Sequence, residues 1–529
     1  MTQFIFFGVL ILYVVIGLIV TRFVKNRKDF YVMGQRGTTF FIVGTLGATY
    51  LSSISLMGIA GQAYAEGPLV VPALGSFGAW LGVLISILFI GRKMRAMGLE
   101  TVPAFFENRF KSKTVSTIAT IIMIIGLFGY GILDFIGAGL LLSEVTGISF
   151  TTMIILFTLA IMTFTVLGGM YGVIVTDTVM FITMLAVSII IAPMLIGQAG
   201  FDAMKNLAET IPGYWTLGGT EGRPLMWSIS QFLVWILFFA VMPAHISRIF
   251  PAKDDFVVIK TGIYAVFLVP IMQIPIFLAA GAMRVLEPNI VDTDSVMIVG
   301  FLNYTSSPVA GIALAGIMAA IMSTASTIFI LIGFALSRDL LESFTKNKLS
   351  ERQSLILGRV TQSAVAILAA IIALTRPTSI YWISIYAGSF FAVGWLPTIV
   401  ASLVWNRMNR QAAIASMLTG VVSFILIGEL RSNGTITLPF NLDELIVSFI
   451  LSTVILIVVV LATKPSPYEI ESAKKLEGIV INKETVEAYK AMPDGLIQMK
   501  KQYKQIMATA IITFIVSVIV WGFFMINLL

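Results

Sequence analysis

The sequence contains no cysteine and only one histidine, His245. Without cysteine the chain cannot form disulfides, thiolate metal sites or thiol redox centres. With a single histidine it has no metal-binding pair of the His-Glu-x-x-His kind and little from which to build a nucleophile with its base. We therefore do not expect an enzyme.

Charged residues are also scarce, at 12% of 529 residues, whereas soluble globular proteins carry about a quarter. Hydrophobic residues make up 58% of the chain and the mean hydropathy is +0.97, which indicates an all-α polytopic membrane protein whose surroundings are the lipid bilayer. We count about 14 apolar runs of roughly 20 residues, the length that crosses a bilayer. They begin near Phe4, Phe40, Val70, Thr114, Ser149, Tyr171, Met226, Val257, Pro308, Gln353, Ser379, Gln411, Glu444 and Ile506.

Basic residues orient these runs, because Lys and Arg gather in the cytoplasmic loops of membrane proteins. With both termini external in the plasma membrane, all but five of the 34 Lys and Arg face the cytoplasm; the exceptions are Lys205, Arg223, Arg284, Arg376 and Arg431. The net charge of +7 therefore fits cytoplasmic loops on an anionic leaflet, and it gives no support to nucleic-acid binding.

No soluble domain interrupts the chain, and five runs from Phe40 and five from Met226 enter the membrane from opposite sides. Inverted five-helix repeats are a common plan of transporters. We expect an extra N-terminal helix and cytoplasmic loop at 1–38, a first repeat at 39–198, an external loop at 199–225, a second repeat at 226–406, accessory helices at 407–463, a charged cytoplasmic segment at 464–505, forming one or two surface helices, and a C-terminal helix at 506–529.

Four hydroxyl side chains lie close together in the apolar run that begins near Pro308. Ser323 is three and four residues from Ser326 and Thr327, and Thr324 is three from Thr327, so they share one side of a helix. Such hydroxyls often bond their own helix backbone or a neighbouring helix. The alternative is a site for a small, hard cation, which needs several oxygen ligands.

The segment from Gly44 to Gly61 combines glycines, hydroxyls and β-branched residues in the middle of a span. This composition weakens a helix and frees backbone carbonyls to face a cavity; a close-packed helix pair is the alternative. Two acids are also placed inside spans, Asp177 about two turns from an end and Asp134 nearer a centre. A carboxylate at such depth needs a cation, a proton or water.

Several segments in this order resemble the sodium:solute symporter family, with the pantothenate and proline permease branches most similar. They are Lys28 to Arg36, Ala48 to Ser53, Gly168-Gly169 through Thr176-Asp177, Pro243 to Arg248 and Met322-Ser323-Thr324. The resemblance implies a leucine-transporter-type fold with inverted five-helix repeats and sodium-driven symport of a small organic solute by alternating access.

Carried over by residue, the resemblance implies a main sodium site made by Ala48, Leu51, Ala320, Ser323 and Thr324. Some members have a second sodium site, similar here to Asp177 with Ser326 and Thr327. Many relatives have Trp-Thr-Asp followed by Gln, whereas this chain has Val175-Thr176-Asp177 and then Phe181, which loosens the match around the second site.

We expect the solute to contact polar and aromatic residues at midplane depth: Thr49, Ser52, Ser53, Ser55, Asp134, Gln231 and Trp235. Relatives that carry carboxylates often present a basic or amide side chain from the span of Asp134, where this chain has an acid and Leu140. A zwitterionic or neutral solute is therefore as credible as pantothenate. We expect His245 near the cytoplasmic end, making a structural hydrogen bond beside Arg248.

Two alternatives stay open. A proton-coupled symporter would need only one titratable carboxylate, Asp134 or Asp177, whereas sodium needs a cage of oxygens. A membrane sensor with a transporter-like core would need a signalling partner, and the sequence gives no evidence of an obligate protein partner.

Overall fold

The fold is seen in a computed structural model of the chain, which describes residues 1–25, 27–70, 74–342, 350–376, 379–439, 442–476 and 483–527. In these ranges the regular structure is helical apart from one isolated β-bridge between Gly37 and Ala252. This confirms the all-α expectation.

The helices of the first half are α1 (Thr2–Val20), α2 (Arg27–Val32), α3 (Thr39–Tyr50), α4 (Ala60–Glu66), α5 (Leu74–Leu84), α6 (Arg92–Ala96), α7 (Pro103–Phe110), α8 (Lys113–Thr146), α9 (Phe150–Ala186), α10 (Ala192–Ala199) and α11 (Phe201–Thr210). Those of the second half are α12 (Leu225–Ala240), α13 (Pro243–Ile249), α14 (Asp255–Leu286), α15 (Val296–Tyr304), α16 (Ser307–Phe334), α17 (Glu351–Ala373), α18 (Ile380–Val404), α19 (Arg410–Ser432), α20 (Glu444–Ala462), α21 (Pro467–Lys475), α22 (Lys483–Lys490) and α23 (Gly495–Asn527). Short 3₁₀ turns are η1 (Thr21–Phe23), η2 (Met33–Gln35) and η7 (Thr293–Ser295), and π-helical turns are η3 (Ile54–Ile59), η5 (Ile85–Gly91), η6 (Val187–Ile191) and η8 (Ala335–Glu342).

The described residues contain 11 helices that are long and apolar enough to cross a membrane, or 13 if each of two bent helix pairs is one span. A shorter apolar helix, Phe150–Met162, corresponds to the remaining run of the fourteen expected. It is joined to the next span inside α9, which kinks at Gly169 with φ 53°. The run expected near Val70 begins partly at residues 71–73, outside the described ranges, and the span found there is Phe77–Ala96.

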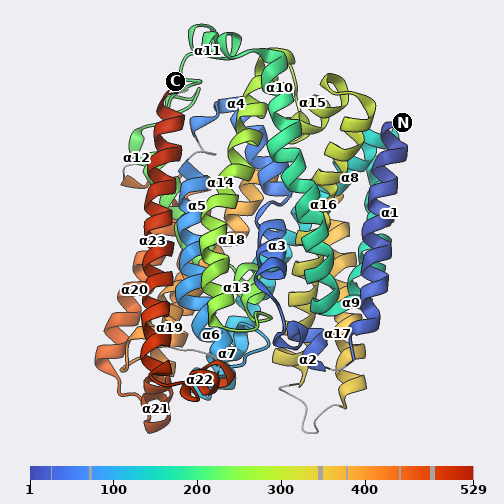
Figure 1. Cartoon of the computed structure of the whole chain (residues 1–529). Coiled ribbons are helices and arrows are strands. Elements are labelled where there is room, and N and C mark those ends of the chain that lie inside the picture. The colour runs from blue at the N-terminus through green and yellow to red at the C-terminus, as the bar shows by residue number, and fades with distance from the viewer. Residues whose placement is uncertain are drawn as a thin grey trace.

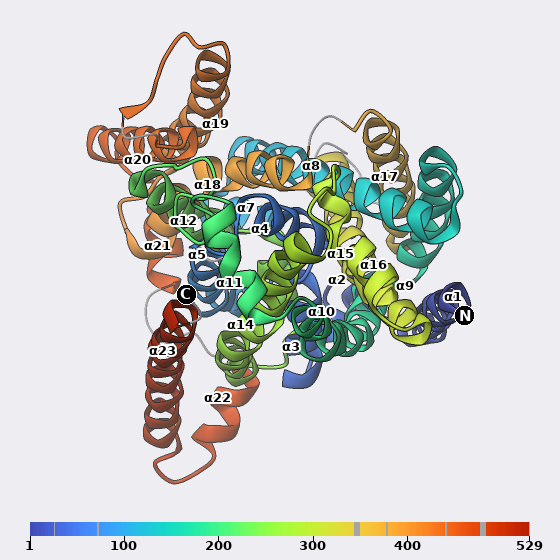
Figure 2. The same ribbon diagram turned by 90° about the horizontal axis from the view of Figure 1, so that it is seen from above.

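The long helices stand side by side, and both chain termini lie at the upper end in Figure 1. Viewed from above, α19, α20 and α23 project from the bundle, while α16 lies among other helices (Figure 2). The most apolar part of α16 is completely buried. Hydroxyls on α16 are therefore enclosed by protein.

Two spans are broken, and each opens one of the expected repeats. The first, α3 with η3 and α4, bends by 49° because Leu51 is extended (φ −80°, ψ 104°) and ends α3. This confirms the break predicted from the Gly44–Gly61 composition. The second, α12 with α13, bends by 42° after Val241 and Met242. Pro243 starts the new helix, where its missing N–H costs nothing.

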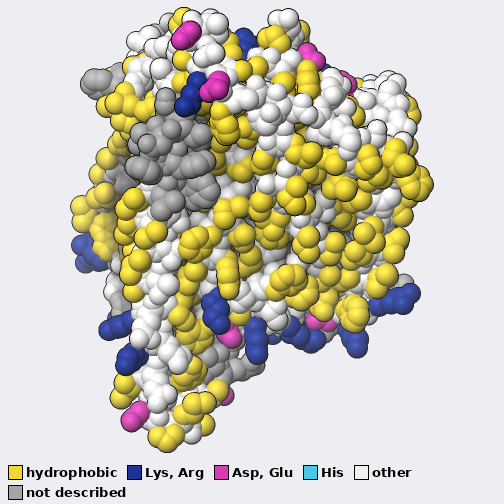
Figure 3. Space-filling view, turned by 45° about the horizontal axis from the view of Figure 1, so that its top comes forward, with side chains coloured by type: hydrophobic (Ala, Val, Ile, Leu, Met, Phe, Trp, Pro, Cys, Tyr) yellow, Lys and Arg dark blue, Asp and Glu magenta, His cyan; other side chains and the backbone are white. Residues whose placement is uncertain are grey.

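The charged segment expected at 464–505 forms α21 and α22, with residues 477–482 outside the described ranges. The C-terminal helix α23 begins at Gly495, earlier than expected, and includes the Lys500 to Lys504 region. Lys and Arg side chains gather along the lower rim of the face in Figure 3.

Candidate functional site

A small cavity of about 20 Å³ lies beside the break between α3 and η3. It is lined by Thr49, Tyr50, Ser52, Ile54, Ser55, Tyr130, Trp235, Phe239, Met242, Ala244, His245, Gln273 and Thr324. These residues come from both broken spans and from α8, α14 and α16. We call this space the midplane cavity. Its volume is enough for about one water molecule, so the helices are closed around it.

Four of the seven residues expected to touch the solute line the midplane cavity: Thr49, Ser52, Ser55 and Trp235. Ser53 and Asp134 lie apart from its lining and bond each other, with Ser53 Oγ donating to Asp134 Oδ1 over 2.7 Å. Gln231 lines a different cavity, described below.

Sequence reasoning did not single out Gln273 of α14, which bonds both halves of the first broken span. Its Nε2 donates to Ser55 Oγ over 3.1 Å, and its Oε1 accepts from the Tyr50 hydroxyl over 3.3 Å. Gln273 lies between Pro270 and Pro275 in an otherwise apolar span. An amide at that depth was the available signal.

His245 lies at a place that the sequence analysis did not predict. The break at Val241 and Met242 turns α13 so that the imidazole lines the midplane cavity, 6.1 Å from the ring of Tyr50 and 5.1 Å from that of Phe239 between centroids. Its Nδ1 is buried and has no hydrogen-bond partner among the described residues. The sequence analysis did not predict this place on the cavity wall, and within the described ranges the structure gives Nδ1 no hydrogen bond of the expected structural kind.

The hydroxyl face of α16 meets the broken helix at the predicted place. Ser323 Oγ lies 2.9 Å from the carbonyl oxygen of Ala48 and 3.0 Å from that of Ala320, to which Thr324 Oγ1 also donates over 3.0 Å. Ala48 is among the last four residues of α3, whose carbonyls lose their helical partners at the break.

Leu51, the fifth predicted ligand, is the buried extended residue at the break itself. The structure therefore brings four of these five residues into direct contact, and the fifth follows Ala48 by three residues in the chain. Uncharged carbonyl and hydroxyl oxygens of this kind suit a hard cation. We call this cluster the neutral cage.

The second predicted sodium site, at Asp177, already contains the positive charge of Arg248. Arg248 Nη2 donates to Asp177 Oδ2 over 2.8 Å and also to Thr327 Oγ1, and both charged side chains are fully buried. Thr45 Oγ1 donates to the same carboxylate oxygen over 2.7 Å. Ser326 Oγ donates instead to the backbone of Ser323. Asp177 and Thr327 are thus brought together through Arg248, which the sequence analysis did not pair with them. We call this the ion-pair cluster.

Arg248 also connects the ion-pair cluster to the midplane cavity. Its Nε donates to Thr49 Oγ1 over 3.1 Å, and Thr49 lines that cavity. Asp177 Oδ1, the second carboxylate oxygen, has no hydrogen-bond partner among the described residues.

The profile of the sodium:solute symporter family matches residues 30–420. The chain belongs to this family. The symporter is 27% identical over 464 residues to the sodium/pantothenate symporter of Haemophilus influenzae, covering 84% of this chain and 93% of that one. It is 26% identical to the osmoregulated proline transporter OpuE of Bacillus subtilis, over 82% of this chain and 89% of OpuE. It is 25% identical to the sodium/proline symporter of H. influenzae, over 89% of this chain and 96% of that one.

Solved structures show the fold of the symporter. A sodium-coupled sialic acid symporter in a substrate-bound, outward-open state matches with a TM-score of 0.73 at 19% identity, covering 88% of this chain and 98% of that one. The nucleobase-cation-symport-1 transporter Mhp1 matches at 0.55 and 15% identity, covering 85% and 99%. The symporter therefore has the leucine-transporter-type fold and is a sodium-coupled solute transporter of the membrane, not an enzyme.

Proposed function

We propose that the symporter takes up a small organic solute bound in the midplane cavity, driven by one sodium ion in the neutral cage. The sodium ligands are the carbonyls of Ala48, Leu51 and Ala320 and the hydroxyls of Ser323 and Thr324. Sodium there would hold α3 against α16, and this would favour one orientation of the cavity. Coupling follows because each ligand then binds better when the other is present.

The observation that carries this proposal is the position of Thr324. Thr324 lines the midplane cavity, and its hydroxyl donates over 3.0 Å to the carbonyl of Ala320, one turn earlier in α16, which also accepts from Ser323 in the neutral cage. The ion and the solute therefore share one wall. A sodium ion at that wall changes the electrostatic potential that the solute meets.

The lining of the midplane cavity bears on the solute. None of its described lining residues is a Lys, Arg, Asp or Glu, and the polar groups are hydroxyls, the Gln273 amide and the His245 imidazole among aromatic rings. A solute carboxylate would thus gain its counter-charge from sodium in the neutral cage. We propose a small carboxylate or amino acid such as pantothenate or proline, the solutes named for the relatives.

A second sodium ion at Asp177, Ser326 and Thr327 would require Arg248 to leave that cluster. The free Asp177 Oδ1 supports a site there, whereas the buried ion pair opposes it. We therefore propose that this site fills only in a conformation in which Arg248 has moved.

The orientation is proposed from charge. The upper end in Figure 1, which holds both termini, faces outward, because the lower rim in Figure 3 carries most of the visible Lys and Arg. The plasma membrane is then crossed with both termini external.

The test is uptake into proteoliposomes of amino acids, pantothenate, short carboxylates and sugars, with sodium or potassium outside at fixed pH. A solute that accumulates only with sodium supports the proposal and identifies the substrate. Accumulation that ignores sodium and follows an inward proton gradient would overturn it.

A matched pair of variants tests the shared wall. Thr324→Val removes the hydroxyl of the cage and keeps the shape, so we expect the sodium concentration for half-maximal uptake and the solute KM both to rise about tenfold, roughly the effect of losing one ligand. Thr120→Val removes a buried hydroxyl that bonds only its own helix at Ser116, and we expect no change. Equal sodium dependence of uptake in both variants would contradict the proposal that Thr324 is a sodium ligand.

A further inference from the structure

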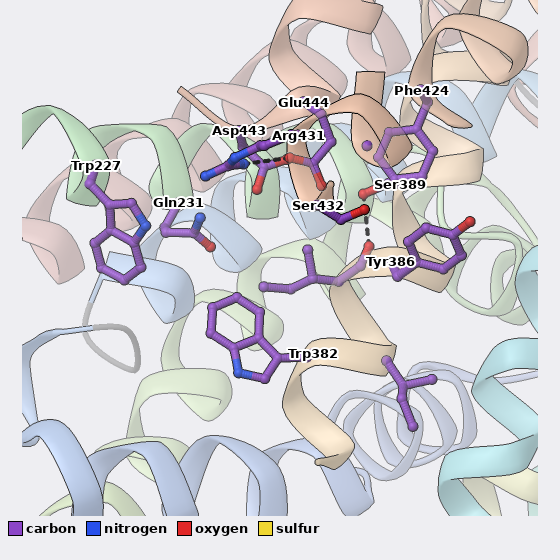
Figure 4. A pocket seen from close by; sticks show the side chains of 13 residues that line it. Trp227, Gln231, Trp382, Tyr386, Ser389, Phe424, Arg431, Ser432, Asp443 and Glu444 are labelled. Atoms are coloured by element: carbon purple, nitrogen blue, oxygen red, sulfur yellow. Dashed lines mark hydrogen bonds and ion pairs between the residues drawn. The ribbon is translucent and has the colours of Figure 1, made fainter. Parts of the chain in front are cut away.

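A cavity of about 610 Å³ opens at the upper end of the bundle, between α12 and α18 on one side and α19 and α20 on the other. Figure 4 shows Trp227, Gln231, Trp382 and Tyr386 around it, with Arg431, Asp443 and Glu444 along one edge. We call it the peripheral cavity. It shares no lining residue with the midplane cavity.

The floor of the peripheral cavity has a polar group without a partner. Gln231 is 2% exposed, and its Oε1 has no hydrogen-bond partner among the described residues. In Figure 4 the amide faces across the cavity toward Trp382. A buried amide oxygen left unpaired costs free energy, so a ligand that donates a hydrogen bond or carries positive charge would be favoured there.

The charges around the peripheral cavity do not balance. Arg431 Nη1 lies 2.5 Å from Glu444 Oε2, so these two side chains neutralise each other. Asp443 is 8% exposed, and its described partners are backbone and amide groups: its Oδ1 accepts from the amide of Leu445, and the Gln231 side chain favours its ionised form. The three side chains together leave one negative charge.

Aromatic rings supply the remaining wall. Trp382 and Tyr386 of α18 line the cavity, and they are 40% and 51% exposed. Neighbouring Trp227 already binds a cation, with the Arg223 guanidinium 4.3 Å from its ring centroid. Aromatic faces beside a carboxylate are the usual environment for organic ammonium groups.

We propose that the peripheral cavity is a second binding site, separate from the solute site, for an organic ammonium group. The cation would lie against Trp382 and Tyr386, with Asp443 as its counter-charge and Gln231 Oε1 as an acceptor. The group can belong to a free amine or to the headgroup of an aminophospholipid. Binding there would join α12 and α18 to the accessory pair α19 and α20.

The test measures choline binding to the purified full-length protein by calorimetry, in potassium buffer and again in sodium buffer. The control ligand is 3,3-dimethyl-1-butanol, which has the shape of choline without its charge. We expect choline to bind at least tenfold more tightly than the alcohol, with the same affinity in both buffers. Equal binding of the two ligands would overturn the proposal, and so would binding that requires sodium, because it would belong to the midplane cavity.

Two variants locate the site. Asp443→Asn removes the charge and keeps the helix cap, since Asn caps helices as well as Asp does; Trp382→Ala removes the ring. We expect each to weaken choline binding about tenfold, whereas Asp202→Asn at the same end and Trp405→Ala at the other end of α18 leave it unchanged. If Asp443→Asn does not fold, the test rests on Trp382→Ala. Choline affinity equal to that of the parent protein in Trp382→Ala would overturn the proposal.

The pH dependence of choline binding gives an independent test of Asp443. Burial, and next the charge of Glu444, raise the pKa of Asp443 to about 6. Arg431 from α19, Gln231 from α12 and Tyr381 from α18 also face it. Since the ionised carboxylate attracts the cation, choline binding should weaken severalfold from pH 7.5 to pH 5, and Asp443→Asn should remove that dependence. Binding independent of pH in the parent protein would contradict Asp443 as the counter-charge.

Choline binding measured in lipid nanodiscs distinguishes a free amine from a lipid headgroup as the natural ligand. If the headgroup is the natural ligand, phosphatidylethanolamine nanodiscs should reduce choline affinity relative to phosphatidylglycerol nanodiscs, and Trp382→Ala should remove the difference. If a free amine is the ligand, both lipids should give the same choline affinity as detergent. Absence of choline binding in detergent and in both lipids would overturn the proposal.

Discussion

Two neighbouring turns of α16 carry the same kind of side chain and meet different partners. Ser323 and Thr324 face the carbonyls of Ala48 and Ala320, which are uncharged. Thr327, one turn on, donates to the carbonyl of Ser323 and accepts from Arg248, which also donates to Asp177. The hydroxyls alone therefore do not decide where a cation binds.

The difference lies in which charges are already satisfied. The neutral cage gathers oxygen atoms without a positive charge among its described members, so a sodium ion there supplies what the oxygens lack. In the ion-pair cluster the guanidinium of Arg248 already neutralises the carboxylate of Asp177. A sodium ion added to that cluster would leave a net positive charge in a fully buried place, which is costly.

The largest effect should come from breaking the ion-pair cluster. Arg248→Gln leaves Asp177 buried without a counter-charge, and we expect a loss of about 3–5 kcal/mol of unfolding free energy. Chemical unfolding in mixed micelles, followed by tryptophan fluorescence, measures the loss.

The control for this change is the double variant Arg248→Gln with Asp177→Asn, in which no charge is left unpaired. It should recover most of the lost stability. If Arg248→Gln alone is as stable as the parent, the charge of Asp177 is stabilised by a group other than Arg248. The proposed difference between the neutral cage and the ion-pair cluster would then be wrong.

A smaller effect should follow from removing one hydroxyl from each turn. Ser323→Ala removes a ligand of the neutral cage, and we expect the sodium concentration for half-maximal uptake to rise about tenfold, which is about 1.4 kcal/mol. Ser326→Ala removes a hydroxyl that bonds only the backbone of Ser323, and we expect a change below about twofold. Sodium-dependent uptake at a fixed solute concentration measures both. A larger effect of Ser326→Ala than of Ser323→Ala would move the driving ion to the second cluster.

Local sequence signals indicated where the neutral cage lies, and the family resemblance implied its five residues. Glycines and hydroxyls weaken the helix around Ala48, and hydroxyls at spacings of three and four mark one face of α16. The break after α12 also had a local signal in Pro243, but only the packed structure shows that His245 lines the midplane cavity.

The ion pair had no local signal. Asp177 and Arg248 are 71 residues apart and belong to different expected repeats, so only the packed structure pairs them. Gln231 and Trp235 show a second limit. They are four residues apart on α12 and were predicted to share one site, yet they line different cavities. Helix spacing predicts a shared face, but one helix turn rises about 5.4 Å, which is enough to pass from one cavity to another.

A second buried carboxylate, Asp134, sharpens the comparison because its partner in the described ranges is an uncharged hydroxyl. Its Oδ1 accepts from Ser53, and its Oδ2 has no partner among the described residues. If sodium is the driving ion, Asp134→Asn should keep sodium-driven accumulation within about threefold, since an amide oxygen can still accept from Ser53. Uptake measured at pH 5.5 and at pH 8, with and without sodium, checks this. Should Asp134→Asn abolish accumulation while Asp134→Glu restores it with an altered pH profile, the coupling would belong to a proton on Asp134, and the neutral cage would only support the fold.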